Sequence, residues 1–236
     1  MRNTRKIKIK NNSGKKNRST KFAHASAVIR IFKKLGVIVE GHFIGVSGQH
    51  LSTYINKDVW MPHTAIVSRI ARMIAQENVE AGRGQKIDVV VGPAIGGIVL
   101  SQWVAFHLSR ITGREVLSVF TEKTSSQNGD GSDQIFKRGY DALVRGKNVL
   151  LVEDTITTGS SIKKAVRAVR RAGGRLIHVS GIINRNPKEV NAGTLGAPSF
   201  SSLAELPLES YAPDKVPEWL AAIPVNKKLG HGGKGK

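Results

Sequence analysis

The stretch from residue 149 to residue 161, VLLVEDTITTGSS, constrains the fold more than any other part of the chain. Its first four residues, Val149 to Val152, are apolar and predict a strand buried on both faces, which is typical of parallel sheets. Two carboxylates follow the strand, and a helical pattern begins at Ile162. This order predicts an α/β fold with a ligand site at the carboxyl end of the strand, where open α/β sheets bind ligands.

The turn between this strand and the helix has the composition of an anion site. Gly159 is surrounded by small hydroxyl residues: Thr157, Thr158, Ser160 and Ser161. Backbone N–H groups at a helix N-terminus suit a phosphate, whereas Glu153 and Asp154 suit a sugar diol or hydrated Mg²⁺. A phosphorylated sugar combines both parts. The alternative is that the hydroxyl residues only cap the helix and the acids only end a solvated loop.

Several other classes of site are excluded by the sequence. No Gly-Lys-Ser/Thr follows the strand and no G-x-G-x-x-G is present here, so neither a Walker loop nor a dinucleotide fingerprint is predicted. The chain has no cysteine, which excludes disulfides, thiolate zinc sites and a cysteine nucleophile. Its seven histidines show no ligand spacing, and Ser47 and Ser101 lack the context of a nucleophile elbow.

The net charge of +20 is concentrated at the two ends of the chain. Residues 1–21 contain nine Lys and Arg and no acid, and the last ten residues contain four Lys and no acid. We expect these ends to be disordered and solubilising, and a nucleic-acid anchor is the alternative. Because no apolar run is long enough to span a bilayer, we expect a soluble, cytoplasmic protein that does not bind membranes.

The rest of the chain alternates predicted strands and helices, as a parallel sheet requires. Strands are predicted at 87–91, 115–120, 149–152, 176–183 and 200–206, and helices at 25–35, 61–81, 98–108 and 162–172. A hairpin is predicted over 47–58, after short extended segments at 37–40 and 41–44. The segment 124–133, TSSQNGDGSD, has almost nothing to bury and predicts a mobile loop suited to covering a site.

Residues 149–161 resemble, along their full length, the phosphoribosyl-pyrophosphate (PRPP) motif of type I phosphoribosyltransferases. The segment 47–58, SGQHLSTYINKD, is similar to the N-terminal hood of the orotate phosphoribosyltransferases. Residues 216–232 resemble the C-terminal segment of a bacterial subgroup of them, so the resemblance covers roughly residues 43–232. It implies the type I phosphoribosyltransferase fold, a parallel sheet flanked by helices with a small hood from the N- and C-terminal segments.

The resemblance also implies a role for each part of the site. Glu153 and Asp154 would hold the ribose hydroxyls, with Mg²⁺ nearby on PRPP and no direct protein ligand assigned. Lys123 would act from the mobile loop, across the interface of a homodimer. The 5-phosphate would be bound by Thr157, Thr158, Gly159, Ser160 and Ser161. Pyrophosphate would contact Pro93, Ala94, Ile95, Gly96 and Gly97, and the base would contact Arg185, Tyr54 and Ile55.

The sequence departs from the family pattern at two places. Gly96 stands where some orotate enzymes have a lysine, so pyrophosphate contacts there would come from the backbone alone. Glu122 stands where the family usually has an arginine, and the loop contains no Lys or His between Thr124 and Gln134. Lys137 and Arg138 are the basic residues that follow the loop and could compensate.

These observations predict a Mg²⁺-dependent enzyme that transfers phosphoribose from PRPP to orotate, giving orotidine 5′-monophosphate and pyrophosphate for pyrimidine biosynthesis. The alternatives are a transferase for another nucleobase, or a non-catalytic PRPP-responsive or RNA-binding regulator on the same fold. Four segments are expected: a basic tail at 1–21, an N-terminal hood segment at 22–60, the core at 61–205, and a C-terminal hood segment with a basic tail at 206–236.

Overall fold

The computed structural model describes residues 13–45, 48–124, 133–207 and 209–229, without the side chains of residues 13–21 and 58. Residues 125–132, which make up most of the predicted mobile loop, lie outside this range. So do residues 1–12 and 230–236, which contain much of the basic ends.

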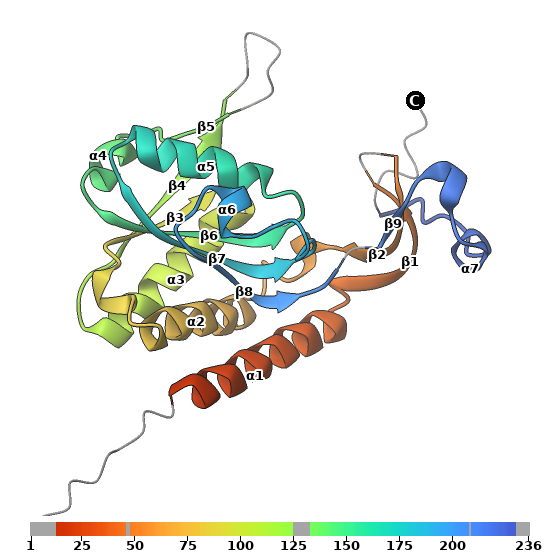
Figure 1. Ribbon diagram of the computed structural model, residues 1–236, viewed down its shortest axis with the longest axis horizontal. Helices are drawn as coiled ribbons and strands as arrows, with labels where there is room; N and C mark the ends of the chain where they lie inside the picture. Colours follow the sequence, from red (N-terminus) through yellow and green to blue (C-terminus); the bar gives the residue numbers. More distant parts are fainter. Residues whose placement is uncertain (1–12, 46–47, 125–132, 208, 230–236) are drawn as a thin grey trace, which may run out of the picture.

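The centre of the molecule is a six-stranded sheet with the order β5-β4-β3-β6-β7-β8 (Figure 1). All neighbours in it pair parallel except β5, which runs antiparallel to β4 at the edge. The arrows of β6, β7 and β8 point toward the smaller sheet at the other end of the molecule. The strands are β3 (Val89–Pro93), β4 (Leu117–Lys123), β5 (Gln134–Ile135), β6 (Asn148–Ile156), β7 (Arg175–Asn184) and β8 (Phe200–Glu205).

Helices cover both faces of this sheet (Figure 1). Alternate residues of β6 point to opposite faces, so Leu150 packs with the helices on one side and Leu151 with those on the other. The first face carries α1 (Ser13–Lys34), α2 (Thr64–Glu80) and α3 (Gly96–Thr112), and the second carries α4 (Tyr140–Val144), α5 (Ser160–Arg171) and α6 (Ala192–Leu195). The strand is buried on both sides, as its apolar run predicts, and the α/β fold class is confirmed.

Helix α1 is longer than predicted and packs against the main sheet rather than forming part of the hood. It begins at Ser13 instead of residue 25, so residues 13–21, which we assigned to a disordered tail, are helical here. Val28 and Phe32 bury into the largest core cluster, and the Phe32 ring lies 5.5 Å from Trp60. Anchored by this apolar stripe, the helix can extend through Lys and Arg residues, which have high helix propensity.

The hood is a separate three-stranded sheet with the order β1-β2-β9, built from both ends of the chain. Its strands are β1 (Ile38–Ile44), β2 (His50–Ile55) and β9 (Ser210–Tyr211). The predicted hairpin is present, because β1 and β2 pair antiparallel. The C-terminal segment is tied to β1 by His42, whose Nδ1 lies 2.8 Å from the Ile223 carbonyl and whose own carbonyl accepts from Asn226 N–H at 2.7 Å.

Short elements connect the sheets. The helix predicted from residue 61 begins only at Thr64, because the chain first makes a turn at Trp60 and Met61 that buries the Trp60 ring. The remaining short helices are η1 (Lys57–Val59), η2 (Gly84–Lys86), η3 (Pro213–Lys215) and α7 (Glu218–Ala221).

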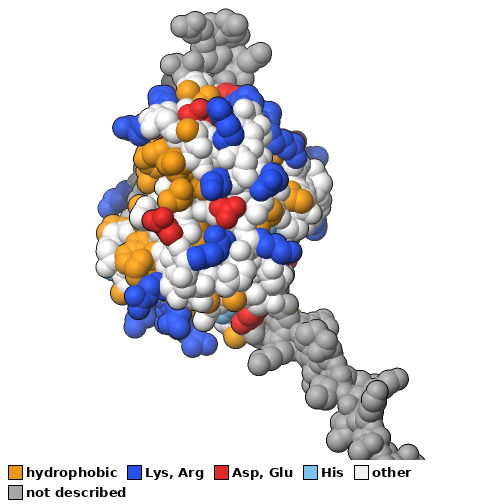
Figure 2. Space-filling model, turned by 90° about the vertical axis from the view of Figure 1, so that its left-hand side faces the viewer, with side chains coloured by type: hydrophobic (Ala, Val, Ile, Leu, Met, Phe, Trp, Pro, Cys, Tyr) orange, Lys and Arg blue, Asp and Glu red, His pale blue; other side chains and the backbone are white. Residues whose placement is uncertain are grey.

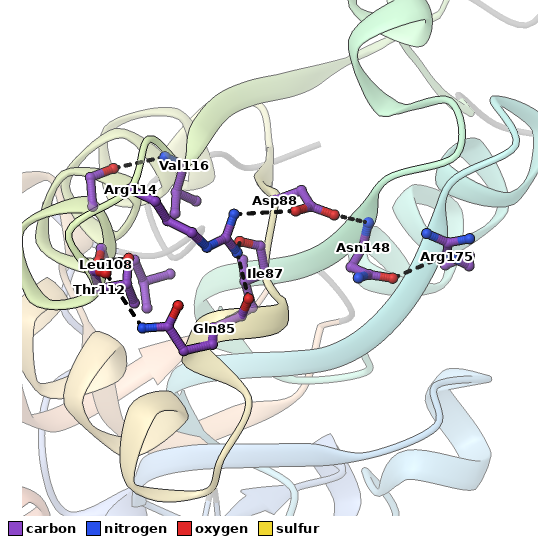
Figure 3. A network of polar contacts seen from close by, with 10 residues as sticks. Gln85, Ile87, Asp88, Leu108, Thr112, Arg114, Val116, Asn148 and Arg175 are labelled. Atoms are coloured by element: carbon purple, nitrogen blue, oxygen red, sulfur yellow. Dashed lines mark hydrogen bonds and ion pairs between the residues drawn. The ribbon is translucent and has the colours of Figure 1, made fainter.

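A polar network ties together the amino ends of the central strands (Figure 3). Asp88, just before β3, accepts from the Asn148 backbone N–H at 2.9 Å and pairs with Arg114 at 3.3 Å. The Asn148 side chain in turn accepts from Arg175 Nε at 3.0 Å. Apart from Arg114 Nε, which is buried without a partner, these groups pair with one another and link the strands, so this edge has a structural role. The carboxyl edge is where open α/β sheets bind ligands.

Positive charge is not confined to the ends of the chain. Figure 2 shows Lys and Arg side chains spread over the face that forms the left-hand side of Figure 1, with fewer Asp and Glu between them. The folded part therefore contributes to the basic character of the protein.

Two phenylalanines of α1 test how this helix is anchored. Phe32 is 1% exposed and Phe22 is 66% exposed. Phe32→Ala should lower the free energy of unfolding by about 3–5 kcal/mol, because it leaves a cavity beside Trp60. Phe22→Ala on the same helix should change it by less than about 0.5 kcal/mol. Urea unfolding measures both, and equal effects would contradict the packing of α1 on the core.

Candidate functional site

Two buried carboxyl groups lie at the carboxyl end of β6. The prediction ended this strand at Val152, but its parallel pairing with β7 continues to Ile156, so the acids belong to the strand itself. Glu153 is 8% exposed and Asp154 is 3% exposed. Glu153 Oε1 accepts from the Asp154 N–H at 3.2 Å, and Asp154 Oδ1 accepts from the Thr155 N–H at 2.6 Å.

The second oxygen of Asp154 is available for a ligand. Asp154 Oδ2 is buried and has no hydrogen-bond partner, although Lys57 Nζ lies 3.8 Å away as an ion pair. That distance is too long for a hydrogen bond, so the two observations agree. A buried acceptor without a donor is costly unless a bound group satisfies it. This oxygen is therefore the strongest sign of a binding site on the acid pair.

The environment of the acid pair favours a neutral Glu153. Burial raises the pKa of Glu153 well above its ordinary value, and the adjacent Asp154 carboxylate raises it further. The positive charge of Lys57 opposes this shift. A protonated carboxyl group can donate a hydrogen bond, which an ionised one cannot do. The pair can therefore offer a donor and an acceptor side by side.

The loop after β3 lies directly against Asp154. A Cβ atom at Gly96 would lie 2.2 Å from Asp154 Oδ2, so a side chain there would displace the Asp154 carboxylate from its present position. This contact explains why glycine suits position 96, where some orotate enzymes have a lysine. Ala94, Ile95 and Gly96 line a cavity, whereas Pro93 and Gly97 are buried and do not.

Gly97 has a packing role rather than a ligand role. A Cβ at Gly92 would lie 1.9 Å from the Gly97 carbonyl oxygen, so the strand and the helix touch through their backbones. This close approach sets the direction in which α3 leaves the sheet. The Ala94–Ile95 peptide of the loop is cis.

A cavity of about 500 Å³ lies between the hood and the carboxyl edge of the sheet. Its lining comes from the hood side, the loop after β3, the end of β4 and the start of the turn after β6. The residues are Lys57, Met61, Ala94, Ile95, Gly96, Glu122, Lys123, Glu153, Asp154, Thr155 and Ser161. Lys57 was not predicted as a site residue, although it stands inside the hood segment quoted for the resemblance. Sequence spacing could not show that it reaches an acid nearly a hundred positions away.

The turn after β6 forms a second cavity of about 170 Å³ next to the first. Its lining includes every residue predicted to bind the 5-phosphate: Thr157, Thr158, Gly159, Ser160 and Ser161. Gly159 has φ = 71° and a Cβ there would lie 2.4 Å from Leu195 Cδ2, so both conformation and space require glycine. Because α5 begins at Ser160, the N–H groups of its first turn face this cavity, and that of Ser160 donates to Thr158 Oγ1 at 3.3 Å.

Lys123 lies at the rim of the larger cavity, at the end of β4. Its neighbour Glu122 receives the two basic residues that follow the loop: Arg138 Nε donates to it at 3.1 Å, and Lys137 Nζ lies 3.6 Å away. Thr124 and Asp133, the described residues on either side of 125–132, are joined by a hydrogen bond from the Thr124 N–H to the Asp133 carbonyl at 3.0 Å. The structure therefore places Lys137 and Arg138 beside Glu122.

The three residues predicted to bind a base do not line either of these cavities. The Ile55 side chain is buried in the main core cluster, because alternate residues of β2 point to opposite faces. Tyr54 packs against Phe43, with ring centres 5.5 Å apart. Arg185 donates to the Thr53 carbonyl at 3.3 Å, and its buried Nε has no partner. Burial lowers the pKa of Arg185.

The described ranges contain neither a metal-binding cluster of side chains nor a membrane-spanning helix. Within residues 13–45, 48–124, 133–207 and 209–229, no group of three or more His, Cys, Asp or Glu is arranged to hold a metal ion. The same ranges contain no helix long and apolar enough to cross a membrane.

Comparison with known proteins places this site in a family. Residues 61–193 match the model of the phosphoribosyl transferase domain. The chain is 35% identical over 200 residues to the orotate phosphoribosyltransferase of Bartonella henselae, covering 85% of this chain and 94% of that protein. The chain belongs to the phosphoribosyltransferase family.

Solved structures support the same fold. The orotate phosphoribosyltransferase of Aeropyrum pernix has a TM-score of 0.57 at 23% identity, covering 75% of this chain and 92% of that one. An adenine phosphoribosyltransferase of Saccharomyces cerevisiae has a TM-score of 0.58 at 19% identity, covering 77% and 99%. Since both resemblances are equally good, the fold alone does not select a base.

The raised pKa of Glu153 predicts a pH-dependent effect of Glu153→Gln. Between the ordinary pKa and its raised value, the folded chain holds a proton that the unfolded chain has released, so stability falls as pH rises through this range. Glutamine is neutral at every pH, so the variant should gain melting temperature relative to the original chain at about pH 8 but not at about pH 4.

Glu205→Gln, at the exposed end of β8, is the matched control for this measurement. Calorimetric melting at both pH values would decide the matter. A Glu153→Gln variant whose melting temperature differs from that of the original chain by the same amount at both values would show that Glu153 is ionised in the fold.

Proposed function

We propose that this protein is an orotate phosphoribosyltransferase, which transfers phosphoribose from PRPP to orotate and releases pyrophosphate. The observation that carries the proposal is the buried Asp154 oxygen without a donor, which lies between the phosphate turn and the loop after β3. A ligand with a phosphate, a sugar diol and a pyrophosphate matches these three parts in that order. The choice of orotate is supported by the 35% identity to an enzyme of that name.

The chain can promote the reaction by stabilising charge on both sides of the ribose ring. As the bond from C1 to pyrophosphate breaks, the ring becomes oxocarbenium-like and pyrophosphate takes the bonding electrons. The base nitrogen then bonds to C1 and loses its proton to solvent. Asp154 would accept a hydrogen bond from a ribose hydroxyl and favour the cationic ring through its charge. The neutral Glu153 would donate to a second oxygen, and the N–H groups at the start of α5 would hold the 5-phosphate.

The acid pair also fits Mg²⁺ bound mainly through the substrate. Mg²⁺ commonly takes one or two protein carboxylates and fills its other positions with phosphate oxygens and water. Asp154 Oδ2 is a hard oxygen donor without a hydrogen bond, and Glu153 lies next to it. The chemistry that Mg²⁺ supplies when bound is neutralisation of charge on the departing pyrophosphate.

Parallel reactions with different bases test the proposal. Pyrophosphate release from PRPP and Mg²⁺ would be followed with orotate, uracil, adenine, hypoxanthine or no base. Release with orotate alone is the expected result. Release with another base would keep the chemistry and replace the substrate. PRPP binding without release would favour a PRPP-responsive regulator, the remaining alternative for this fold.

Asp154→Asn should lower kcat by about 100-fold or more with little change in melting temperature, because it removes the charge that faces the ring. Asp141→Asn is the control, since Asp141 is also ion-paired, with Arg145 at 4.0 Å, but lies on α4 away from the cavity. An unchanged kcat in Asp154→Asn would overturn the assigned role.

We also propose that two copies of the chain associate through α3. This helix begins at the site and exposes apolar side chains, including Phe106, which is 50% exposed and packs edge-on to Trp103 at 5.7 Å. Val99, seven residues before Phe106, is exposed on the same face of the helix. A second copy on this face would bury that surface and lie close to the cavity rim where Lys123 stands.

Phe106→Glu should therefore shift the protein from dimer to monomer in size-exclusion chromatography with light scattering, because a buried unpaired charge opposes association. Phe22→Glu, which changes an exposed aromatic on α1, is the control and should leave the dimer intact. A Phe106→Glu variant as dimeric as the original chain would exclude this face.

A further inference from the structure

Lys57 belongs to the hood segment, and its ammonium group lies close to the carboxyl pair of Glu153 and Asp154 in the core. It is the first residue of η1, directly after β2, and it lines the larger cavity together with Asp154 and Gly96. Its side chain is 51% exposed, and its Nζ lies 3.8 Å from Asp154 Oδ2. The ammonium group is half in solvent, but its partner Asp154 is only 3% exposed, so Lys57 can leave the pair at little cost only when a bound group satisfies the Asp154 oxygen in its place.

The larger cavity contains few basic groups that could bind an anion. Among the described residues, the carboxyl groups of Glu122, Glu153 and Asp154 and the ammonium groups of Lys57 and Lys123 line it. Even with Glu153 neutral, the carboxylates of Glu122 and Asp154 offset the two lysines, so a polyanion is bound poorly unless the lysines can reach it. The two basic groups beside Glu122 are already engaged with that carboxylate.

The loop after β3 carries no cation of its own next to the acid pair, since Ala94, Ile95 and Gly96 line the cavity there. Gly96 touches Asp154 Oδ2 so closely that even a methyl group would lie 2.2 Å from it. The ammonium of Lys57 approaches this same oxygen, so it stands beside Gly96 although it comes from another part of the chain. The hood thus places a positive charge beside a loop position that carries no side chain.

We propose that Lys57 binds the pyrophosphate part of PRPP, and released pyrophosphate, by exchanging partners with Asp154. In the empty site its ammonium neutralises Asp154. When PRPP binds, a ribose hydroxyl donates to Asp154 Oδ2 and Lys57 turns to the pyrophosphate oxygens beside Gly96. This inference rests on the proposed function, and it assigns a role to a residue of the hood segment for which the sequence analysis gave none.

The test is the affinity of Lys57→Met for ligands that do or do not carry pyrophosphate. With Mg²⁺ present, calorimetry should show pyrophosphate binding weakened by about 10-fold or more, the loss expected for a charge-assisted hydrogen bond. Ribose 5-phosphate, which lacks pyrophosphate, should bind as before. In turnover, KM for PRPP should rise while KM for the base stays constant, and Lys57→Arg should retain most of the affinity.

Lys33→Met is the matched control, because Lys33 is also an exposed lysine paired with one carboxylate, Glu40, at 3.7 Å. It lies on α1 and does not line the cavity, so its pyrophosphate affinity should be that of the original chain. Unchanged pyrophosphate binding in Lys57→Met would overturn the inference. Equal loss of pyrophosphate and ribose 5-phosphate would also overturn it, since that pattern indicates a general structural effect.

The design separates this inference from the proposed function. An original chain that binds pyrophosphate but does not turn over orotate would refute the orotate proposal, while the binding comparison would still decide the role of Lys57. An original chain that binds neither ligand would refute both.

Discussion

The contact between Gly96 and the carboxylate of Asp154 is the constraint on which the site depends. It joins the loop after β3 to the end of the neighbouring parallel strand β6, at the same edge of the sheet. The backbone contact between Gly92 and Gly97 directs α3 away from that edge and allows the loop to reach Asp154. A side chain at Gly92 would collide with the Gly97 backbone, and one at Gly96 would displace the Asp154 carboxylate, so close packing fixes the loop against both.

The hood completes the site through a few polar contacts rather than a large core. Arg185, at the end of β7, donates to the Thr53 carbonyl of β2, and Lys57 pairs with Asp154. Behind them, Ile55 and Trp60 join the main apolar cluster. The hood is therefore anchored by its last residues on the core, while its charged groups remain free to meet a ligand.

The sequence was most informative where a local pattern and a chemical requirement coincide. The run from Val149 to Ser161 predicted the central strand, the acid pair at its end and the turn into the next helix, because each depends on neighbours in the chain. Element ends were less predictable. The strand continues to Ile156 because β7 pairs with it there, and α1 begins early because its apolar stripe finds a partner in Trp60.

Contacts between distant segments could not be read from the sequence. Lys57 and Asp154 come together only when the hood lies over the sheet, and nothing near either residue specifies that distance. Ile55 was expected to face a base, but the register of β1 and β2 turns it to the core. The departure at Gly96 was visible in the sequence, whereas its cause, the oxygen of Asp154, was not.

The pairing of β9 with β2 has a consequence for how the molecule is made. The hood begins with residues near the start of the chain, but its third strand consists of residues 210–211, and His42 binds residues still further on. During synthesis on the ribosome, the central sheet can form before β9 has been made, when the hood consists of β1 and β2 alone. The wall that closes the cavity is therefore finished only when synthesis is almost complete, so truncated chains would keep the acid pair but leave it beneath an incomplete hood.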